Sequence, residues 1–565
     1  MCQSRGGRVP APSPLGTPGA RRAITRRKED PVAHPKETEQ HAGGSEFTPP
    51  LGVELPRPET QGSAFARPGT RTSSQLSHPA FTPPEGIPVV SLSKETPWPD
   101  RMRTMLRMPV GERPAPEQPA RQPEAEGGPP VPRVLDLTLR IGELLLAGGE
   151  GAEDVEAAML GVAHAYGLGR VEPTVTFTLL GISYQPSLVD APVTANRTVR
   201  RRATDYTRLA AVFRLINDIT AADLSLEDAY RRLAGIRRNR HPYPGWLLTA
   251  AAGLLAGAAS MLVGGGGPLV FAIAALGAML GDRLAWLCAG RGLPEFYQFV
   301  AAAMPAAVMG VLVARFGQHL PGTSSLQASA VITGGLFALI PGRALVAAVQ
   351  DGLTGFYITA SARLLEVMYL FTGIVVGVTL ILYAGVSLGA ELDPDQAFRA
   401  YENPPVQLVA AMVLSLAFAV LLQCERGVLV VAALNGGVAW TVYAALHQET
   451  IGVGMSPVAA TAVAAGLVGL FGQVLSRYRH ASALPYVTAA IGPLLPGSAT
   501  YFGLLGLTRG HLDQGFASLT KAAALALAVA IGVNLGGEIA RLFIKLPGGA
   551  GQARRRAAAK RTRGF

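Results

Sequence analysis

Two stretches of this sequence carry the same interruption: LFALIPGRALVAAVQDGLTGF, from Leu336 to Phe356, and IGPLLPGSATYFGLLGLTRGH, from Ile491 to His511. In each stretch an apolar run stops at Pro-Gly and continues as a segment that mixes apolar and polar residues. The two prolines, Pro341 and Pro496, lie 155 positions apart (496 − 341). Because proline removes a backbone donor and glycine loosens the turn, each stretch predicts a helix that breaks at its Pro-Gly.

The chain around these stretches divides into regions of different composition. It has 565 residues, a formal net charge of +11 and a mean hydropathy of +0.28. Residues 1–128 are rich in Pro, Arg, Ser, Thr and Glu and predict a disordered tail. Beyond residue 240 the chain is a succession of apolar runs, each near the roughly 20 residues that cross a bilayer as a helix. The sequence therefore predicts a mainly α, polytopic helical membrane protein.

A soluble domain is predicted for residues 129–240, between the tail and the first apolar run. VLDLTLRIGELLLAGG and EGAEDVEAAMLGVAHAYGLG have helical periodicity and end in glycine. VEPTVTFTLLGISYQ alternates and is rich in Val and Thr, which predicts a strand. Two more helices follow, the last with Ser225 as its N-cap. This is the pattern of a small α+β domain.

The apolar half divides into ten candidate spans. They start near Gly245, Pro268, Phe296, Leu326, Leu364, Val406, Gly427, Ser456, Leu484 and Phe516. Five spans make a first transmembrane repeat at 241–400, five make a second at 401–545, and 546–565 is a basic tail. Because five is odd, the second copy enters the membrane from the opposite side, so the sequence predicts a 5+5 inverted repeat.

The arginines indicate the orientation in the membrane. RRLAGIRRNRHPYPGW places five of them before the first span, so we expect the N-terminal side to be cytoplasmic. An even number of spans returns the basic C-terminal tail to the cytoplasm. This interpretation places the basic charge against the plasma (inner) membrane, and no recognition motif indicates nucleic acid. Cys2, Cys288 and Cys424 have no metal-binding or disulfide spacing, and no cleaved signal peptide is evident.

The two breaks, Pro341-Gly342 and Pro496-Gly497, have two interpretations. Backbone groups freed in hydrocarbon are costly unless they line a polar cavity or are packed in protein, so the breaks line a site between the repeats. Alternatively, each Pro-Gly is a tight turn at a membrane surface. The segments that follow, 344–362 and 499–515, are too polar for spans and too apolar for loops. They are re-entrant, interfacial or part of tilted broken helices.

Polar side chains within the apolar half are candidates for a substrate or proton pathway. They are Asp282, Arg283, Asp351, Asn435, Asn534 and Glu538. We assign coupling or ammonium binding to the two aspartates, and polar contacts to the two asparagines, because a small zwitterion needs both kinds of group. The alternative for Asp282 is an ion pair with Arg283 near the cytoplasmic surface. The alternative for the amides is contact between helices.

The soluble domain carries the motifs of a known family. LRIGELLLAGGEGAEDVEAAMLGVAHAYGL, VTFTLLGISY and RLINDITAADLSLEDAYRRLAGI precede the first span, and LIPG and LLPG occupy the two halves. In these motifs the chain resembles the bacterial threonine/serine exporter family over roughly residues 130–545. The resemblance implies a cytoplasmic domain joined to about ten spans, and export of L-threonine and L-serine driven by the proton motive force. It implies an amino acid, protons and lipid as partners, leaves a homo-oligomer open, and requires no cofactor or metal.

Other function classes have less support. Glu143, Glu150, Asp154, His164, Ser183 and Asp205 lie in the soluble domain, but it has no GxSxG motif and only one histidine on a helix, so we predict no enzyme activity. The spans offer no nucleophile and base for an intramembrane hydrolase. The rival class is a membrane-anchored sensor or scaffold whose cytoplasmic domain binds a partner.

Overall fold

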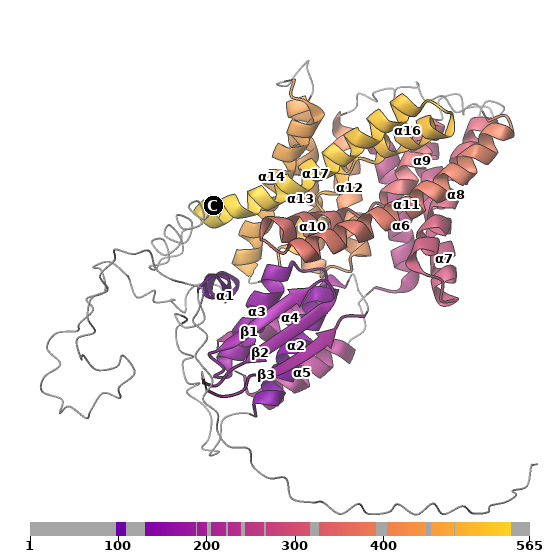
Figure 1. Ribbon diagram of the computed structural model, residues 1–565. Coiled ribbons are helices and arrows are strands. Elements are labelled where there is room, and N and C mark those ends of the chain that lie inside the picture. Colours follow the sequence, from indigo (N-terminus) through magenta and orange to yellow (C-terminus); the bar gives the residue numbers. More distant parts are fainter. Residues whose placement is uncertain are drawn as a thin grey trace, which may run out of the picture. The chain divides into compact units, whose positions relative to one another are not determined.

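The computed structural model describes residues 98–108, 113, 130–187, 189–200, 205–221, 224–238, 243–264, 267–316, 327–390, 404–447, 454–479 and 481–543. The tail before residue 98, Cys2 and the basic tail 546–565 lie outside the described residues. The described part is mainly helical, with one three-stranded sheet in its N-terminal region (Figure 1).

The soluble domain is an antiparallel sheet packed against helices. Its helices are α2 (Val131–Ala147), α3 (Ala152–Ala165), α4 (Tyr206–Thr220) and α5 (Leu226–Arg238). Its strands, in the spatial order β1-β2-β3, are β1 (Val171–Thr176), β2 (Leu179–Tyr184) and β3 (Val193–Thr198). Side chains of β1 alternate between buried and more exposed, so that one face of the strand packs against α3.

The helices of this domain lie where the sequence places them, but the sheet is larger than expected. VEPTVTFTLLGISYQ folds as two strands joined at Phe177, whose φ is 51°. The third strand, β3, was not predicted because VTANRT has few apolar residues and its side chains are mostly exposed. The expected cap is present, since Ser225 Oγ accepts a hydrogen bond from the Asp228 N–H at 3.2 Å.

A helix also forms within the region predicted to be a disordered tail, which corrects that prediction for residues 98–106. This helix, α1 (Trp98–Leu106), packs against α3 and buries Trp98, Met102 and Met105. A nine-residue helix is marginal on its own in water. Its stability therefore comes from contacts with other elements, which composition alone does not reveal.

Eight helices are long and apolar enough to cross a membrane, counting only the described residues. They are α6 (Gly245–Leu262), α7 (Pro268–Gly290), α8 (Glu295–Phe316), α11 (Tyr357–Ser387), α12 (Pro404–Leu421), α13 (Arg426–His447), α14 (Pro457–Arg479) and α17 (Leu512–Phe543). A ninth span results if α9 (Ala328–Phe337) and α10 (Gly342–Leu353), which meet at an angle of 54°, count as one. At the remaining predicted start, near Leu484, the chain forms only the short α15 (Leu484–Thr488) and a 3₁₀ turn, Gly492–Leu494.

The two Pro-Gly breaks have matching geometry. Pro341 has φ −79° and ψ 51°, and Pro496 has φ −81° and ψ 52°. Each proline is followed by a helix of 12 residues, α10 and α16 (Gly497–Thr508). Each helix ends before a left-handed glycine, Gly355 or Gly510, again 155 positions apart (510 − 355). The repeat is therefore present in backbone conformation as well as in sequence.

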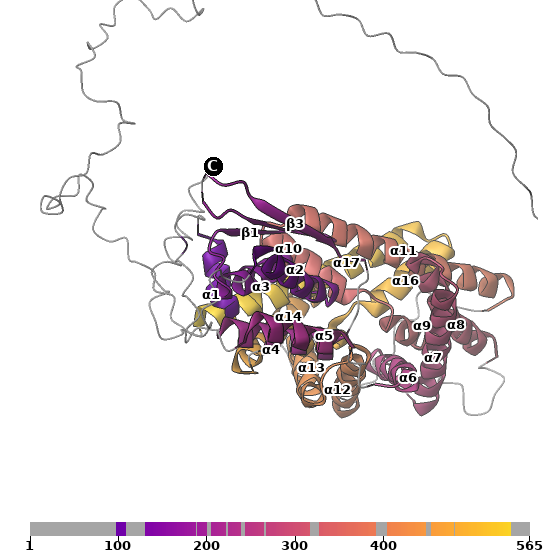
Figure 2. The same ribbon diagram turned by 90° about the horizontal axis from the view of Figure 1, so that it is seen from below.

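The equivalent helices, α10 and α16, lie on opposite sides of the membrane region. In Figure 1, α10 lies beside the soluble domain, whereas α16 lies at the far side of the membrane region. Across the two halves, α10 packs against α17 and α11 packs against α16. This arrangement agrees with the predicted inverted repeat. Seen from below, the domain overlies α10 and α14, while α7 and α8 lie beside it (Figure 2).

Candidate functional site

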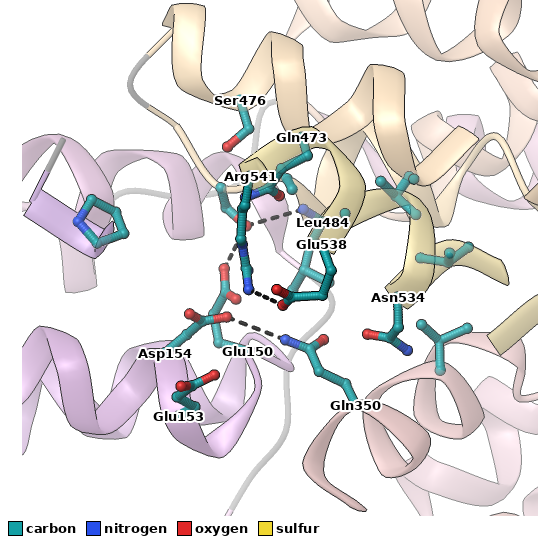
Figure 3. A pocket seen from close by; sticks show the side chains of 18 of the residues that line it. Glu150, Glu153, Asp154, Gln350, Gln473, Ser476, Leu484, Asn534, Glu538 and Arg541 are labelled. Atoms are coloured by element: carbon teal, nitrogen blue, oxygen red, sulfur yellow. Dashed lines mark hydrogen bonds and ion pairs between the residues drawn. The ribbon is translucent and has the colours of Figure 1, made fainter. Parts of the chain in front are cut away.

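A cavity of about 490 Å³ lies between the soluble domain and the membrane region. Its walls come from α1, α3, α10, α14, α15 and α17 (Figure 3). This volume is typical of small-molecule sites, which measure roughly 300–1,000 Å³. Along α17 the lining changes from Ile531 and Asn534 to Glu538 and Arg541 as the helix approaches its C-terminal end. The cavity therefore combines an apolar part among the spans with a charged part beside the domain.

The loop between α2 and α3 brings the domain against the spans at this cavity. Gly149 has φ +93°, and a Cβ there would lie 2.4 Å from Nη1 of Arg343 on α10. A Cβ on Gly151 would lie 2.9 Å from Nε2 of Gln350. Glycine is favoured at Gly149 by its left-handed backbone conformation, and at both positions side chains of α10 lie close to the loop. The sequence GGEG, Gly148 to Gly151, is thus the docking loop of the domain.

Glu150, in the middle of the docking loop, carries its carboxyl group into the buried interface. The residue is 4 % exposed, and its carboxylate accepts a short hydrogen bond from the Ser482 hydroxyl. Burial raises the pKa of Glu150 to about 7, against the lowering effects of Ser482, Arg103 and Arg363. Ser482 Oγ also accepts a hydrogen bond from Leu484 N–H at 3.1 Å, at the first residue of α15. The Ser482 side chain therefore links the Glu150 carboxyl group to the broken element of the second half.

An ion pair fastens the same loop to the first half. Nη1 of Arg363 on α11 lies 2.9 Å from Oδ2 of Asp351 on α10, and both side chains are almost wholly buried. Oδ1 of Asp351 accepts a hydrogen bond from Ala152 N–H at 2.8 Å. Nη2 of Arg363 donates to the Glu150 carbonyl oxygen at 2.9 Å. Asp351, a candidate from the sequence, lies at this joint, next to the cavity residue Gln350, which donates to Asp154 at 3.3 Å.

Helix α1 closes another side of the cavity. Asp100 pairs with Arg477 of α14 at 2.8 Å, with both side chains about nine-tenths buried. Arg103 pairs with Asp154 of α3, and Arg107 pairs with Glu153 at 2.7 Å. A segment that the sequence assigned to the tail therefore joins the domain to the second half.

Asp282 and Arg283 lie away from the cavity. Oδ2 of Asp282 accepts a hydrogen bond from the Thr249 hydroxyl and lies 3.1 Å from Nη2 of Arg283. Arg283 also donates to the carbonyl oxygen of Gly245, the first residue of α6. Both side chains are at least one-third exposed. The pair occupies one end of α6, as the alternative interpretation of these residues expects.

The two asparagines occupy different surroundings. Asn435 is 8 % exposed, and its amide donates to the carbonyl oxygens of Val468 at 3.4 Å and Tyr486 at 3.3 Å. These bonds join α13 to α14 and α15, which is contact between helices. Asn534 lines the cavity and donates to the Ala530 carbonyl oxygen at 2.8 Å, within its own helix. Glu538 also lines the cavity, where it pairs with Arg541 (Figure 3).

The Pro-Gly breaks face each other beside the cavity and do not form its lining. A Cβ on Gly342 would lie 2.8 Å from Cδ2 of Leu495, and one on Gly497 would lie 2.2 Å from Cε2 of Phe337. Pro496 and Gly497 are buried, and Pro341 is partly buried. In this conformation the breaks are packed in protein, where the first half meets the second. Arg343, directly after the first break, does line the cavity.

Glu150 and Arg343 are among the cavity residues that sequence reasoning did not select as site candidates. Glu150 was seen only as one of several acids in a soluble domain, and Arg343 was not selected. The signal for Glu150 was the run GGEG, because glycines on both sides of one acid indicate close approach of another backbone or side chain.

Comparisons with known proteins agree with this architecture. A family model described as "Putative threonine/serine exporter" matches residues 136–384, which cover the soluble domain and the first half up to α11. A second, described as "Threonine/Serine exporter, ThrE", matches residues 407–538, which cover the second half.

Two curated relatives match most of the chain. A protein named "Probable threonine/serine exporter" from Mycobacterium tuberculosis is 35% identical over 413 residues, 72% of this chain and 76% of that protein. A protein named "Threonine/serine exporter" from Corynebacterium glutamicum is 30% identical over 436 residues, 74% of this chain and 84% of that protein. No solved structure matches this chain.

Proposed function

Since this chain belongs to the threonine/serine exporter family, we propose that it carries L-threonine and L-serine out of the cell as a secondary transporter driven by proton entry. The observation that supports this most directly is the cavity between the domain and the broken helices. It is large enough for a small amino acid and offers acids, arginines, amides and hydroxyl groups together.

Alternating access is supported by the meeting of the two breaks. Each half of the membrane region contains one interrupted element, and the two interruptions pack on each other through Leu495 and Phe337. A movement of one half against the other would change this contact. The same movement would open the cavity to one side of the membrane and then to the other. Pro341, Gly342, Pro496 and Gly497 then act as the hinge of the site.

The residues proposed from the sequence take different parts in this scheme. Asn534 contacts the substrate in the cavity, Glu538 pairs there with Arg541, and Asn435 holds α15 in place. Asp351 and Arg363 fix the domain to the first half, and Asp282 with Arg283 anchors the start of α6. We place the chain in the plasma membrane with both termini in the cytoplasm, because the domain and the C-terminal end of α17 line the same cavity.

Efflux from cells tests this proposal. Cells that lack the chromosomal gene are loaded with a threonine-containing dipeptide, and external threonine is measured with and without this chain. We expect faster efflux with the chain, and loss of the difference when a protonophore collapses the gradient. Equal efflux with and without the chain would rule out export and leave the sensor or scaffold as the better explanation. Faster efflux that ignores the protonophore would remove only the coupling to protons.

A further inference from the structure

Glu150 is a buried acid with fewer hydrogen-bond and charge partners than a buried carboxylate usually has. It comes from the soluble domain and lines the cavity, and its carboxylate accepts a hydrogen bond from the Ser482 hydroxyl. A buried carboxylate is costly unless a cation or several donors surround it. Arg363 lies 2.9 Å from Asp351, and its Nη2 donates to the backbone carbonyl oxygen of Glu150. The carboxylate therefore has capacity for a further cationic partner inside the cavity.

Arg343 offers the opposite charge on the same cavity. Nη1 of Arg343 donates to the Gly148 carbonyl oxygen at 3.1 Å, and among the described residues no carboxylate lies within ion-pair distance of it. Tyr206 lies near both groups. Burial raises the pKa of the Tyr206 hydroxyl to about 12, and of the charges around it Arg343 lowers that pKa while Glu150 raises it. Glu150, Arg343 and Thr488 line the same cavity, and the Tyr206 hydroxyl donates to Thr488 Oγ1 at 3.3 Å.

We propose that Glu150 and Arg343 form the zwitterion-binding pair of the exporter, in which the Glu150 carboxylate binds the ammonium group of the amino acid or a proton, one at a time. This inference rests on the proposed function and assigns the soluble domain a direct part in the site. Arg343 binds the substrate carboxylate, and Thr488, which lines the same cavity, offers its hydroxyl to that of threonine or serine.

The exchange of a proton for an amino acid at Glu150 needs no further reactant. When Glu150 is protonated, its neutral carboxylic acid has no charge to attract an ammonium group. When an amino acid binds, the proton leaves Glu150 for water and the ammonium takes its place. One proton therefore moves against one amino acid, because both need the same carboxylate.

Other charged groups around Glu150 are already paired, which leaves this carboxylate and Arg343 for the ligand. The pairs that face it from the other elements are Asp100–Arg477, Arg103–Asp154, Arg107–Glu153, Asp351–Arg363 and Glu538–Arg541. Because each pair is close to neutral, the charge of the cavity is set by Glu150 and Arg343. Together they match a zwitterion with no net charge.

The link to the broken helix gives the exchange a structural consequence. Ser482 donates to Glu150 and accepts from Leu484 N–H, so its hydroxyl connects the carboxylate to the start of α15. Exchange of the ionised carboxylate for a carboxylic acid changes which partner donates in this hydrogen bond. The element that carries the second break therefore senses whether a proton or an ammonium occupies the site.

Threonine binding by the purified full-length protein tests this inference. Binding of radiolabelled threonine is measured between about pH 5 and pH 8, and proton release is followed with an indicator dye in weak buffer. Wild-type binding should weaken as the pH falls through about 7, where Glu150 takes up its proton, and binding near neutral pH should release protons. Glu150→Gln should lower the affinity roughly tenfold or more, since a charge-assisted bond is lost, and should abolish both pH effects. Arg343→Gln should lower the affinity but keep the pH dependence.

Two further variants separate binding from folding. Glu156→Gln is the matched control: Glu156 lies on α3, burial raises its pKa to about 7, and it accepts from Val175 N–H away from the cavity. It should bind threonine as the wild type does. Ser482→Ala removes a bond that lowers the pKa of Glu150, so the midpoint of the pH profile should move to higher pH.

The results of these binding experiments distinguish a failure of this inference from a failure of the proposed function. Wild-type affinity and pH dependence in Glu150→Gln, or an unmoved midpoint in Ser482→Ala, would overturn this inference and leave export intact. Equal losses in Glu150→Gln and Glu156→Gln would do the same, because they would indicate damage to the domain. Absence of threonine binding by the wild type would overturn the proposed function and the inference together.

Discussion

The ion pair between Asp351 and Arg363 is a buried contact at the joint between domain and spans. Asp351→Asn keeps the shape of the side chain but leaves a buried guanidinium without its counter-charge, which costs about 3–5 kcal/mol in proteins. We therefore expect a clear fall in the thermal unfolding midpoint of the purified protein. Asp282→Asn is the contrast, because its pair with Arg283 is partly exposed and such pairs contribute about 0–1 kcal/mol. Similar midpoints for the two variants would show that the joint does not need this pair.

The docking loop is equally sensitive at one glycine. Gly149→Ala must place a Cβ 2.4 Å from Nη1 of Arg343 and hold φ near +93°, a conformation that costs roughly 1–2 kcal/mol for other residues. We expect a lower unfolding midpoint and weaker export in the cell assay. Gly235→Ala is the control, since Gly235 lies in α5 with open space around it and alanine favours the helix. Export at the wild-type level in Gly149→Ala would mean that the loop moves away without consequence.

For individual residues, the sequence predicted which polar side chains lie in the apolar half, but it did not predict which residues they contact. Asp351, Asn534 and Glu538 were found because polar side chains are rare in apolar runs. Glu150 was not selected, because in a soluble domain an acid is ordinary and only the docking of that domain on α10 makes it buried. Contacts such as Ser482 to Glu150 join residues 332 positions apart, which no local pattern encodes.

Among the elements, α1 shows how a short polar segment acquires structure from its surroundings. Trp98 contacts Phe213 of α4 with ring centroids 5.5 Å apart, and Asp100 reaches Arg477 of α14. Trp98→Ala removes the largest of these contacts, and such core truncations cost about 3–5 kcal/mol. We expect α1 to detach and its backbone amides to exchange faster in hydrogen-exchange mass spectrometry, while α2 and α3 keep their protection. Unchanged exchange in α1 would mean that its ion pairs suffice to hold it.

The broken helices were the most predictable elements. Pro-Gly dictates a break wherever it interrupts an apolar run, and it does so at Pro341 and Pro496 with nearly the same backbone angles. What the sequence could not provide was the length of the element before each break. In the first half it is the ten-residue α9, whereas in the second it is α15, with only five residues, and a 3₁₀ turn. The apolar run near Leu484 is long enough for a span, but Pro485, Pro493 and Pro496 divide it.

For the whole molecule, the two halves are related by one broken element in each, α9 with α10 in the first and α15 with α16 in the second. The fold class followed from composition and from the repeat, because apolar runs of this length and number have few other solutions. The position of the soluble domain did not follow, since it is set by long-range contacts such as Thr207 with Gln423 and Arg214 with Glu425. These contacts place the domain over the cavity and make it part of the site.

The inverted repeat makes a prediction about equivalent residues on the two sides of the membrane. Tyr357 begins α11 and Leu512 begins α17, 155 positions apart (512 − 357), and both side chains are more than half exposed. If the halves are inverted, these two positions face opposite compartments, although their local surroundings are alike. In a chain whose native cysteines are replaced, Leu512→Cys should react with a membrane-impermeant maleimide in intact cells. Tyr357→Cys, which lies on the side of the soluble domain, should react only in inside-out vesicles. Labelling of both cysteines from the same side would contradict the inversion, because a parallel repeat requires that result, and the two breaks could not then be related by a two-fold axis in the membrane plane.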